Sequence, residues 1–357
     1  MKRKFWSKQI LDLVPYTPGE QPKINDLIKL NTNENPYPPS PLVSKLLAQF
    51  DIDHLRRYPD PESFELSQTL ADYYNVAVDN IFIGNGSDEV LAHAFMAFFR
   101  QQQPILMPDI SYSFYTVYCD LYAIKATAIP IEDDFSIDLA KYNIANGGII
   151  FANPNAPTGS AISLQKIEQL LETNQQSLVI VDEAYVDFGA QSAVALTQKY
   201  DNCLVIQTLS KSRALAGLRI GYAIGNKNLI EALERVKNSF NSYPLDMLAQ
   251  ACAKTAIEDE DYFQSSLKKI VATRTWTEQQ LASLDFKVLP SKTNFLFVQH
   301  KNLAAIEIMQ YLRDNKIIVR HFTKEKISNY LRISIGTQQQ MQSLIECLNK
   351  LLREEEK

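Results

Sequence analysis

The sequence lacks the patterns that mark disulfide-bonded, metal-binding or nucleic-acid-binding proteins. Its four cysteines have no paired spacing, so we expect reduced thiols in the core rather than disulfides or a metal site. The four histidines show no spacing typical of metal ligands either. A formal net charge of −5 gives no electrostatic attraction to nucleic acid or to an anionic membrane surface, and we expect neither as a partner.

Long apolar segments are also missing. No stretch of roughly 18 apolar residues is present that could span a membrane. The basic start Met1–Lys4 is followed only by a short apolar stretch, which Ser7, Lys8 and Asp12 interrupt. This is a poor secretory signal. We therefore expect a cytoplasmic protein.

The sequence does contain alternating strand and helix patterns typical of an α/β protein. With 357 residues, of which 46% are hydrophobic, the chain is long enough for a large core and two domains. Short apolar runs alternate with helical segments, which indicates a mostly parallel sheet covered on both faces. The expected strands of this sheet are residues 81–84, 104–107, 148–151, 178–181, 203–206 and 220–224.

Three regions differ in character along the chain. Residues 1–40 are rich in proline and asparagine and predict an extended arm. Residues 41–284 contain the alternating pattern and end in a long helical stretch of more than one helix, and we expect them to form a large domain. Residues 285–357 predict a smaller α+β domain, which the arm joins. Its expected strands are residues 286–289, 295–298, 317–320 and 330–335, with helices at 303–315 and 338–354.

Candidate functional residues follow four of the expected strands at their C-terminal ends. Ligands of parallel sheets bind beyond those ends, so we expect the candidates to converge at one place. One of the four segments also opens a helix, where free backbone N–H groups bind an anion. The candidates are Gly86, Ser87 and Asp88 after residues 81–84, the loop 153–159 after 148–151, Asp182 after 178–181, and Ser210 and Lys211 after 203–206.

This combination of a lysine, an acid and an arginine suits pyridoxal 5′-phosphate. The Lys211 amine suits covalent attachment to the cofactor, Asp182 suits its pyridine nitrogen, and Arg219 with the serine hydroxyls suits its phosphate. Taken singly, the motifs have structural explanations, since residues 182–185 could cap a helix and residues 153–159 could form a turn. Their order and spacing together indicate a cofactor site.

Six segments carry a resemblance to a known family. They are Tyr16–Glu20, Leu30–Pro36, Arg57–Asp60, Gly84–Glu89, Ser210–Lys211 with Leu215–Arg219, and Leu331–Thr337. With them the chain resembles the fold-type I, pyridoxal-phosphate-dependent aminotransferases of class I/II over essentially its whole length. Within that group it is most similar to the histidinol-phosphate aminotransferases. The resemblance implies a large domain with a mostly parallel, seven-stranded sheet and a smaller α+β domain.

The resemblance also implies roles at the cofactor. Lys211 would bind the cofactor covalently and move the proton at the substrate Cα. Asp182 would keep the pyridine nitrogen protonated, and Tyr185 would donate a hydrogen bond to the phenolic oxygen. Tyr112 would stack on the ring. Phosphate and loop contacts are implied for Gly86, Ser87, Asp88, Asn155, Ser210 and Arg219.

Substrate binding and assembly follow from the same resemblance. Arg332 would pair with the carboxylate of L-glutamate, and Arg320 and Arg332 would meet the phosphate of L-histidinol phosphate, with Tyr16 and Asn33 nearby. Tyr58 would reach the cofactor phosphate of a neighbouring subunit, which implies a homodimer with shared active sites. The implied reaction transfers an amino group from L-glutamate to imidazole-acetol phosphate in L-histidine biosynthesis.

Two positions depart from the family pattern. Ala156 stands where asparagine usually bonds the phenolic oxygen, so either Asn155 reaches in, or Tyr185 and water supply that bond. We expect the electronic properties of the cofactor to change without loss of activity. Arg213, two residues after the lysine, is also unusual, and we expect it to be solvated or close to the phosphate.

Three other functions are compatible with parts of the pattern. An aromatic amino acid aminotransferase would use the same residues with a different acceptor. A pyridoxal-phosphate-dependent decarboxylase of phosphorylated amino acids differs in which bond at Cα is broken, and the sequence does not reveal that. A non-catalytic regulatory module fits poorly, because the catalytic lysine is present.

Overall fold

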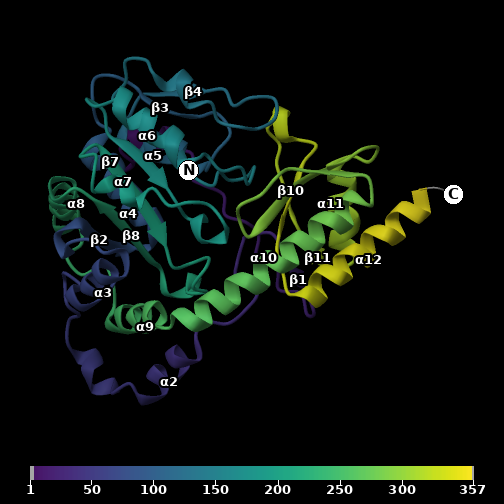
Figure 1. Ribbon diagram of the computed structural model, residues 1–357, viewed down its shortest axis with the longest axis horizontal. Coiled ribbons are helices and arrows are strands. Elements are labelled where there is room, and N and C mark those ends of the chain that lie inside the picture. Colours follow the sequence, from purple (N-terminus) through teal and green to yellow (C-terminus); the bar gives the residue numbers. More distant parts are fainter. Residues whose placement is uncertain (1–3, 356–357) are drawn as a thin grey trace.

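The computed structural model describes residues 4–355 and contains three sheets, the two larger of which are linked by a long helix, α10 (Glu260–Ala282) (Figure 1). The basic start at residues 1–3 lies outside the described residues. The larger sheet has seven strands and the smaller one has four. Because α10 leaves the larger sheet and packs beside the smaller one, it connects the two parts of the chain.

The seven-stranded sheet has the order β2-β8-β7-β6-β5-β3-β4. Only β8 runs antiparallel to its neighbours β2 and β7, so the mostly parallel sheet expected from the sequence is confirmed. The C-terminal ends of β2, β5, β6 and β7 therefore lie at one edge. The strands are β2 (Ile81–Asn85), β3 (Ile105–Pro108), β4 (Ala126–Ile129), β5 (Ile149–Ala152), β6 (Val179–Asp182), β7 (Cys203–Thr208) and β8 (Ile220–Gly225).

Alternate side chains of the central strands enter two separate hydrophobic clusters. In β6, Val179 and Val181 belong to one cluster and Ile180 to the other, and β7 divides in the same way. Successive side chains of a strand point to opposite faces, so helices must cover both faces of the sheet. This double burial explains why these strands are continuous apolar runs in the sequence.

The helices around this sheet begin and end at recognisable signals. The Ser40 hydroxyl accepts a hydrogen bond from the Leu42 N–H and caps α2, which has proline at its first position. The expected long helical stretch is two helices, because Asp259 ends α9 and caps α10. The helices are α2 (Pro41–Gln49), α3 (Phe64–Tyr74), α4 (Gly86–Phe98), α5 (Phe114–Tyr122), α6 (Leu164–Thr173), α7 (Val194–Thr197), α8 (Lys227–Phe240) and α9 (Met247–Glu258).

The smaller sheet is antiparallel and has the order β12-β13-β10-β9. The expectation of one strand over residues 317–320 is wrong, because the chain changes sheets at Val319. Residues before it pair with the arm as β11, and residues after it pair with β13 as β12. The elements are β9 (Phe286–Val288), β10 (Phe295–His300), α11 (Ala305–Asp314), β11 (Ile317–Ile318), β12 (Arg320–His321), β13 (Leu331–Ser334) and α12 (Gln338–Glu355).

The N-terminal arm is mostly extended, with two short regular elements. Helix α1 (Lys8–Asp12) buries none of its residues, whereas β1 (Ile28–Lys29) pairs in parallel with β11. The Leu30 N–H donates to the carbonyl of Ile318, and the Ser334 N–H donates to the carbonyl of Leu30. The arm therefore packs against the smaller sheet before the chain enters the larger one.

Neither disulfides nor membrane-spanning helices are found in the described chain. All four cysteines lie within it, buried and without a disulfide. Between residues 4 and 355, no helix combines the length and the apolar character that crossing a membrane requires.

Candidate active site

A cavity of about 110 Å³ lies where the C-terminal ends of β2, β5, β6 and β7 meet, and we call it the sheet pocket. It brings together most of the predicted cofactor residues from five separate parts of the sequence. Of that predicted set, Gly86, Asn155 and Tyr58 do not line it. The lining residues are Ser87, Asp88, Tyr112, Ala152, Ala156, Asp182, Ala184, Tyr185, Thr208, Ser210, Lys211 and Arg219.

Asp182 is the buried acid of the sheet pocket. Its Oδ2 accepts a hydrogen bond from the Tyr115 hydroxyl at 2.6 Å, and its Oδ1 accepts one from the Ala184 N–H at 3.2 Å. Burial raises the pKa of Asp182 to about 6, and these two hydrogen bonds oppose that rise. No cation pairs with this carboxylate in the described residues, so a protonated ring nitrogen would complete its surroundings.

Lys211 and Tyr185 lie beside each other in the cavity that Asp182 also lines. The Lys211 Nζ donates to the Thr32 carbonyl at 3.3 Å and lies 5.9 Å from the centroid of the Tyr185 ring. The Tyr185 hydroxyl accepts a hydrogen bond from the Asn33 Nδ2 at 2.9 Å. Because that bond uses an acceptor site, the Tyr185 proton is free to be donated to a ligand.

The start of α4 and Arg219 form the anion-binding side of the pocket. The first N–H groups of a helix have no intrahelical partner, and here they face the pocket beside Arg219. Gly86 has φ +82°, and a Cβ there would lie 2.4 Å from the Arg219 Nη2. A Cβ at Gly221 would lie 2.2 Å from the Ser87 nitrogen. These glycines let β8, Arg219 and the helix start approach one another closely.

Asp88 orients two of the other pocket residues through its side chain. It forms an ion pair with Arg219 at 2.8 Å and accepts a hydrogen bond from the Tyr112 hydroxyl at 2.8 Å. Thr208 likewise donates to the Ser210 Oγ at 3.0 Å. The sequence reasoning missed these contacts, together with the bond from Tyr115 to Asp182. No local sequence pattern indicates these contacts, because each contact joins residues on different elements or on opposite sides of a turn.

Asn155 does not reach the pocket, contrary to one of the two expectations for it. Its side chain is fully buried, and its amide nitrogen donates to the Ile110 carbonyl and to the Thr158 Oγ1. Its Oδ1 accepts from the Ser111 hydroxyl. Ala156 lines the pocket in its place, which leaves Tyr185 as the residue available to bond a phenolic oxygen.

Arg213 is neither solvated nor beside the anion-binding side, so that expectation is wrong. Its side chain is buried and forms an ion pair with Glu260 at the start of α10. It does not line the sheet pocket. The sequence carries no sign of this, because the ion pair joins residues 47 positions apart.

A second cavity of about 160 Å³, which we call the arginine pocket, shares Tyr112, Ala156, Tyr185 and Lys211 with the first. It contains all four predicted substrate residues, from the arm and from the smaller sheet. The lining residues are Tyr16, Gly19, Asn31, Thr32, Asn33, Ser111, Tyr112, Ser113, Ala156, Pro157, Tyr185, Lys211, Arg320, Phe322 and Arg332.

The two arginines of this pocket are direct cross-strand partners. Arg320 on β12 lies opposite Arg332 on β13 in the antiparallel register. The Arg332 Nη2 donates to the Asn31 carbonyl at 2.9 Å, but its buried Nε has no hydrogen-bond partner within residues 4–355. Desolvation lowers the pKa of Arg332, and the charge of Arg320 acts in the same direction. The pocket therefore holds uncompensated positive charge.

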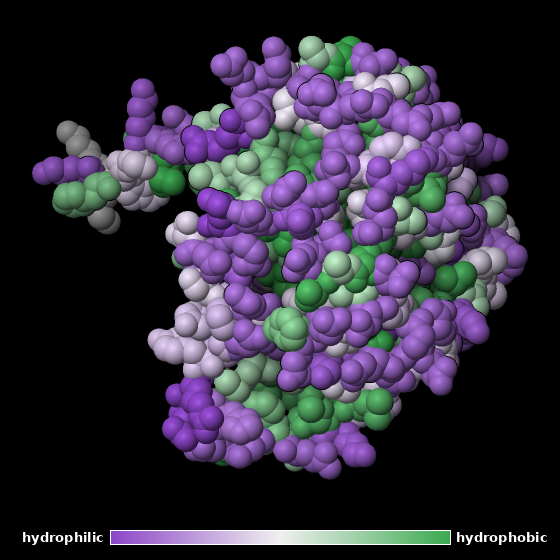
Figure 2. All heavy atoms as spheres, turned by 60° about the vertical axis from the view of Figure 1, so that its left-hand side comes forward, coloured by the Kyte–Doolittle hydropathy of each residue, from purple (hydrophilic) through white to green (hydrophobic). Residues whose placement is uncertain are grey.

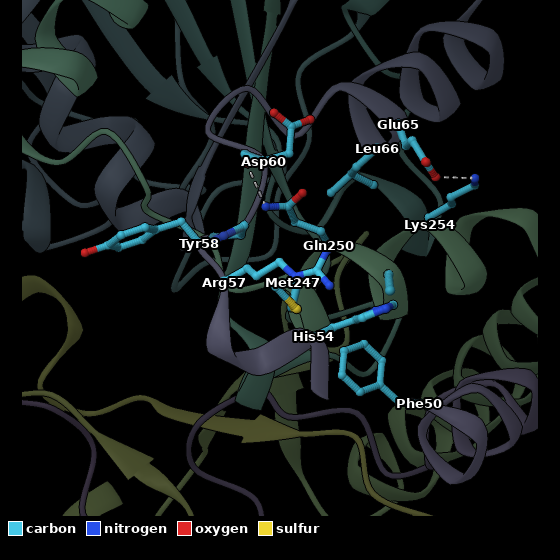
Figure 3. Close-up of a pocket in the computed structure, with 12 residues that line it drawn as sticks. Phe50, His54, Arg57, Tyr58, Asp60, Glu65, Leu66, Met247, Gln250 and Lys254 are labelled. Atoms are coloured by element: carbon cyan, nitrogen blue, oxygen red, sulfur yellow. Dashed lines mark hydrogen bonds and ion pairs between the residues drawn. The ribbon is translucent and has the colours of Figure 1, made fainter. Parts of the chain in front are cut away.

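Tyr58 lies away from both pockets. It is 81% exposed and its ring stacks on Tyr243 with 4.8 Å between centroids. It borders a separate cavity of about 380 Å³ between η1 (Ile52–Arg56), α3 and α9, and its side chain extends away from the other labelled residues (Figure 3). Within one chain, Tyr58 makes no contribution to the sheet pocket.

The sheet pocket fits pyridoxal 5′-phosphate in the chemistry of its donor groups. Asp182 offers an unpaired buried carboxylate for a cationic ring nitrogen. The start of α4 with Arg219 offers donors for a phosphate. Lys211 supplies an amine for covalent attachment, and Tyr185 supplies a hydroxyl that can donate a hydrogen bond.

Comparisons with known proteins agree with this geometry. Residues 25–348 match the family Aminotransferase class I and II. The chain is 57% identical to Histidinol-phosphate aminotransferase 1 from Hydrogenovibrio crunogenus over 98% of both chains. It is 54% identical to Histidinol-phosphate aminotransferase from Chromohalobacter salexigens over 98% of this chain and 99% of that protein.

The fold is also that of solved members. The crystal structure of histidinol-phosphate aminotransferase from Sinorhizobium meliloti in complex with pyridoxal-5′-phosphate matches with a TM-score of 0.84 at 25% identity. That match covers 92% of this chain and 91% of the other. Sequence match, fold and pocket chemistry lead to one conclusion: the chain belongs to the class I and II aminotransferases, which depend on pyridoxal 5′-phosphate.

Proposed function

We propose that this aminotransferase moves an amino group between L-glutamate/2-oxoglutarate and imidazole-acetol phosphate/L-histidinol phosphate, as a step in L-histidine biosynthesis. The names of relatives at 54–57% identity over nearly the whole chain support this choice of substrate. The structural observation that carries it is the arginine pair beside Lys211.

Like charges directly opposite each other in a sheet destabilise it unless something compensates them. The opposed Arg320 and Arg332, with an unpartnered Nε on Arg332, are therefore a site for an anion. The guanidinium fork suits carboxylate and phosphate equally well. One pocket thus serves L-glutamate in one half-reaction and a phosphorylated substrate in the other.

The residues of the sheet pocket take the remaining roles in this proposal. When bound, pyridoxal 5′-phosphate takes up the amino group and delocalises the negative charge left at the substrate Cα. The Lys211 Nζ, held at the junction of both pockets, removes and returns the proton at that Cα. Asp182 keeps the ring nitrogen protonated, and the Tyr185 hydroxyl donates to the phenolic oxygen.

Complete transamination with each amino donor tests the proposal. Purified holoenzyme with 2-oxoglutarate is given either L-histidinol phosphate or L-phenylalanine, and glutamate formation is measured. We expect stoichiometric glutamate with L-histidinol phosphate at low concentration and far slower formation with phenylalanine. The reverse preference would favour an aromatic aminotransferase, and release of carbon dioxide from a phosphorylated amino acid without glutamate would favour a decarboxylase.

We also propose that the chain works as a homodimer in which Tyr58 reaches the phosphate of the partner's cofactor. The exposed Tyr58, which lines neither the sheet pocket nor the arginine pocket of its own chain, supports this role. In Figure 2 hydrophobic atoms form a band along the lower edge of the face shown, where α2 lies in Figure 1. Exposed apolar side chains of α2 and the adjoining η1 are Leu42, Leu47, Ile52 and Leu55.

Mixing two defective variants tests the sharing of sites. Lys211→Ala lacks the catalytic amine, and Tyr58→Ala lacks the contact supplied to the partner. After subunit exchange, a mixed dimer contains one site with both residues intact. The mixture should be more active than the two preparations measured separately, and activity equal to their sum would contradict shared sites.

The domain division remains a proposal as well. It comprises an arm at residues 1–40, a large domain at 41–284 and a small domain at 285–357, with α10 ending close to the second boundary. The cytoplasmic location stays a prediction from the sequence.

A further inference from the structure

Arg213 is a buried charged residue to which none of the roles above gives a purpose. It follows Lys211 by two positions, yet only 7% of it is exposed. Burying a guanidinium is costly unless its charge and its donors are satisfied. Its surroundings therefore bear on what it does.

The guanidinium group of Arg213 makes a hydrogen bond, an ion pair and a ring contact where α9 ends and α10 begins. Its Nη1 donates to the Ala256 carbonyl at 2.7 Å, near the C-terminal end of α9. Its Nη2 pairs with the Glu260 carboxylate at 3.0 Å, in the first residue of α10. Its central carbon lies 3.4 Å from the centroid of the Phe263 ring, so the group is stacked on that ring.

The backbone between Lys211 and Arg213 is held at other points as well. The Asn35 Nδ2 donates to the carbonyls of both Lys211 and Ser212 at 3.0 Å. The Ser212 hydroxyl donates to Asp187, which lies two residues after Tyr185. These bonds tie the lysine segment to the arm and to the strand-end loop that contains the other catalytic candidates.

The loop that follows adopts a conformation that needs support. Ala214 has φ +58°, in the left-handed region that a residue with a Cβ disfavours. The loop is closed behind it by a hydrogen bond from the Leu215 N–H to the Leu209 carbonyl at 3.0 Å. The anchored side chain of Arg213 directly precedes this strained residue.

We propose that Arg213 is a positioning residue for Lys211. It touches neither pocket, and it acts by fixing the backbone of the lysine segment to α9 and α10. The inference rests on the proposed catalytic role of Lys211. It predicts that loss of Arg213 slows the steps in which the lysine amine takes part and leaves substrate affinity unchanged.

Three variants and a matched control test this inference in the holoenzyme. Arg213→Met removes the charge and the donors, Arg213→Lys keeps the charge, and Glu260→Gln weakens only the ion pair. Arg235→Met is the control, because Arg235 forms an exposed ion pair with Glu231 within α8. Arg213→Met should lower kcat about tenfold with KM values within about twofold, since small misplacements of a reacting group are costly. Arg213→Lys should recover part of this loss, and Arg235→Met should have no effect.

A second readout does not depend on turnover. Apo-protein is mixed with pyridoxal 5′-phosphate, and the rate of covalent attachment is followed by absorbance. Borohydride reduction and mass spectrometry then verify Lys211 as the attachment site. Arg213→Met should slow attachment at least about threefold, because the amine samples its reactive position less often. A purely structural arginine would lower the unfolding temperature without changing this rate.

The results distinguish a failure of the inference about Arg213 from a failure of the role proposed for Lys211. A folded Arg213→Met with wild-type kcat and wild-type attachment rate overturns the inference. If that variant does not fold, wild-type rates in both Arg213→Lys and Glu260→Gln overturn it instead. Lys211→Ala measured in parallel identifies the other failure: if it retains activity, the proposed role of Lys211 is wrong rather than that of Arg213.

Discussion

The two cavities that meet at Lys211 differ in how completely their polar groups are satisfied. In the sheet pocket, Asp88 already pairs with Arg219, and Tyr115 already bonds Asp182. In the arginine pocket, two guanidinium groups lie opposite each other, and the Arg332 Nε has no partner in the described chain. The first cavity is preorganised by one sheet, and the second depends on an incoming anion.

This difference predicts two kinds of mutant. Changes in the sheet pocket remove interactions that act on the reacting atoms, so they should lower kcat. Changes in the arginine pocket remove attraction for the substrate anions, so they should mainly raise KM. A variant that behaves the other way would break the distinction.

The largest effect is expected for Lys211→Ala. Without the amine that moves the proton at Cα, kcat should fall by about 10⁴-fold or more. The protein should stay folded, because within residues 4–355 the Lys211 side chain makes a single long hydrogen bond, to the Thr32 carbonyl. Glutamate-dependent transamination and circular dichroism measure the two expectations. Retention of full activity would contradict the assignment.

Asp182→Asn should have the next largest effect on activity. An amide does not hold a proton on the ring nitrogen, so kcat should fall by about 10²–10³-fold. KM for L-glutamate should change much less, because Asp182 does not line the arginine pocket. Steady-state kinetics with both substrates measures the changes in kcat and KM. A rise in KM without a fall in kcat would contradict the assignment of Asp182 to the cofactor.

The same variant should stabilise the apo-protein at neutral pH. Burial raises the pKa of Asp182 from 3.8 to about 6, so the folded state holds this proton more tightly than the unfolded chain does. The stability that the proton contributes is complete below about pH 4 and is lost as the pH rises through 6. Asp182→Asn should therefore exceed wild type by on the order of 3 kcal/mol at pH 7.

Urea unfolding of the apo-protein at pH 4.5 and pH 7 checks the sign of this effect. The gap between Asp182→Asn and wild type should be small at the lower pH and open at the higher one. An equal gap at both values would mean that the carboxylate is not destabilised by its burial. Glu183→Gln should open a gap of the same sign, since burial also raises the pKa of Glu183, to about 7, outside the sheet pocket.

Arg332→Gln should show the KM effect expected of the arginine pocket. The loss of a guanidinium that pairs with carboxylate should raise KM for L-glutamate by about 10–100-fold and lower kcat only slightly. The exposed Arg235→Gln controls for the loss of a charge elsewhere. A fall in kcat at unchanged KM would show that the pocket acts on chemistry and not on binding.

Ala156→Asn is expected to have the smallest effect. An amide at this position could share the bond that Tyr185 supplies, so kcat should stay within about fivefold of wild type. The pH midpoint of the cofactor absorbance should move, because the phenolic oxygen gains a donor. Tyr185→Phe should then cost less activity in the Ala156→Asn background than alone. Equal costs would mean that the two positions do not share that oxygen.

The sequence was most informative where both faces of an element are buried. All six strands expected for the large sheet contribute side chains to both hydrophobic clusters, and their apolar runs are visible without a structure. The edge strand β4 was missed, because Ala126 and Ala128 are exposed and give no apolar run. The split of residues 317–320 was missed because it depends on which sheet supplies each partner.

Site residues were predictable to the extent that their chemistry appears in the sequence itself. Lys211, Asp182 and Arg219 are recognisable by residue type and by their place after strands. The roles of Tyr115 and Arg213 were not predictable, because they depend on contacts with residues that are distant in the sequence. The burial of the Asn155 amide was likewise invisible, since its partners Ile110 and Ser111 lie more than forty residues away.

The pairing of the arm with β11 and its bond to β13 also have a consequence for the order of assembly. All seven strands of the larger sheet are complete by Gly225, whereas Asn33 bonds Ser334 across 301 positions. During synthesis the arm emerges first, but its partners in β11 and β13 emerge almost last. A nascent chain therefore forms the lysine-bearing sheet well before it forms a place for the substrate anion. The pocket for the substrate anion is complete only when the arm meets β11 and β13.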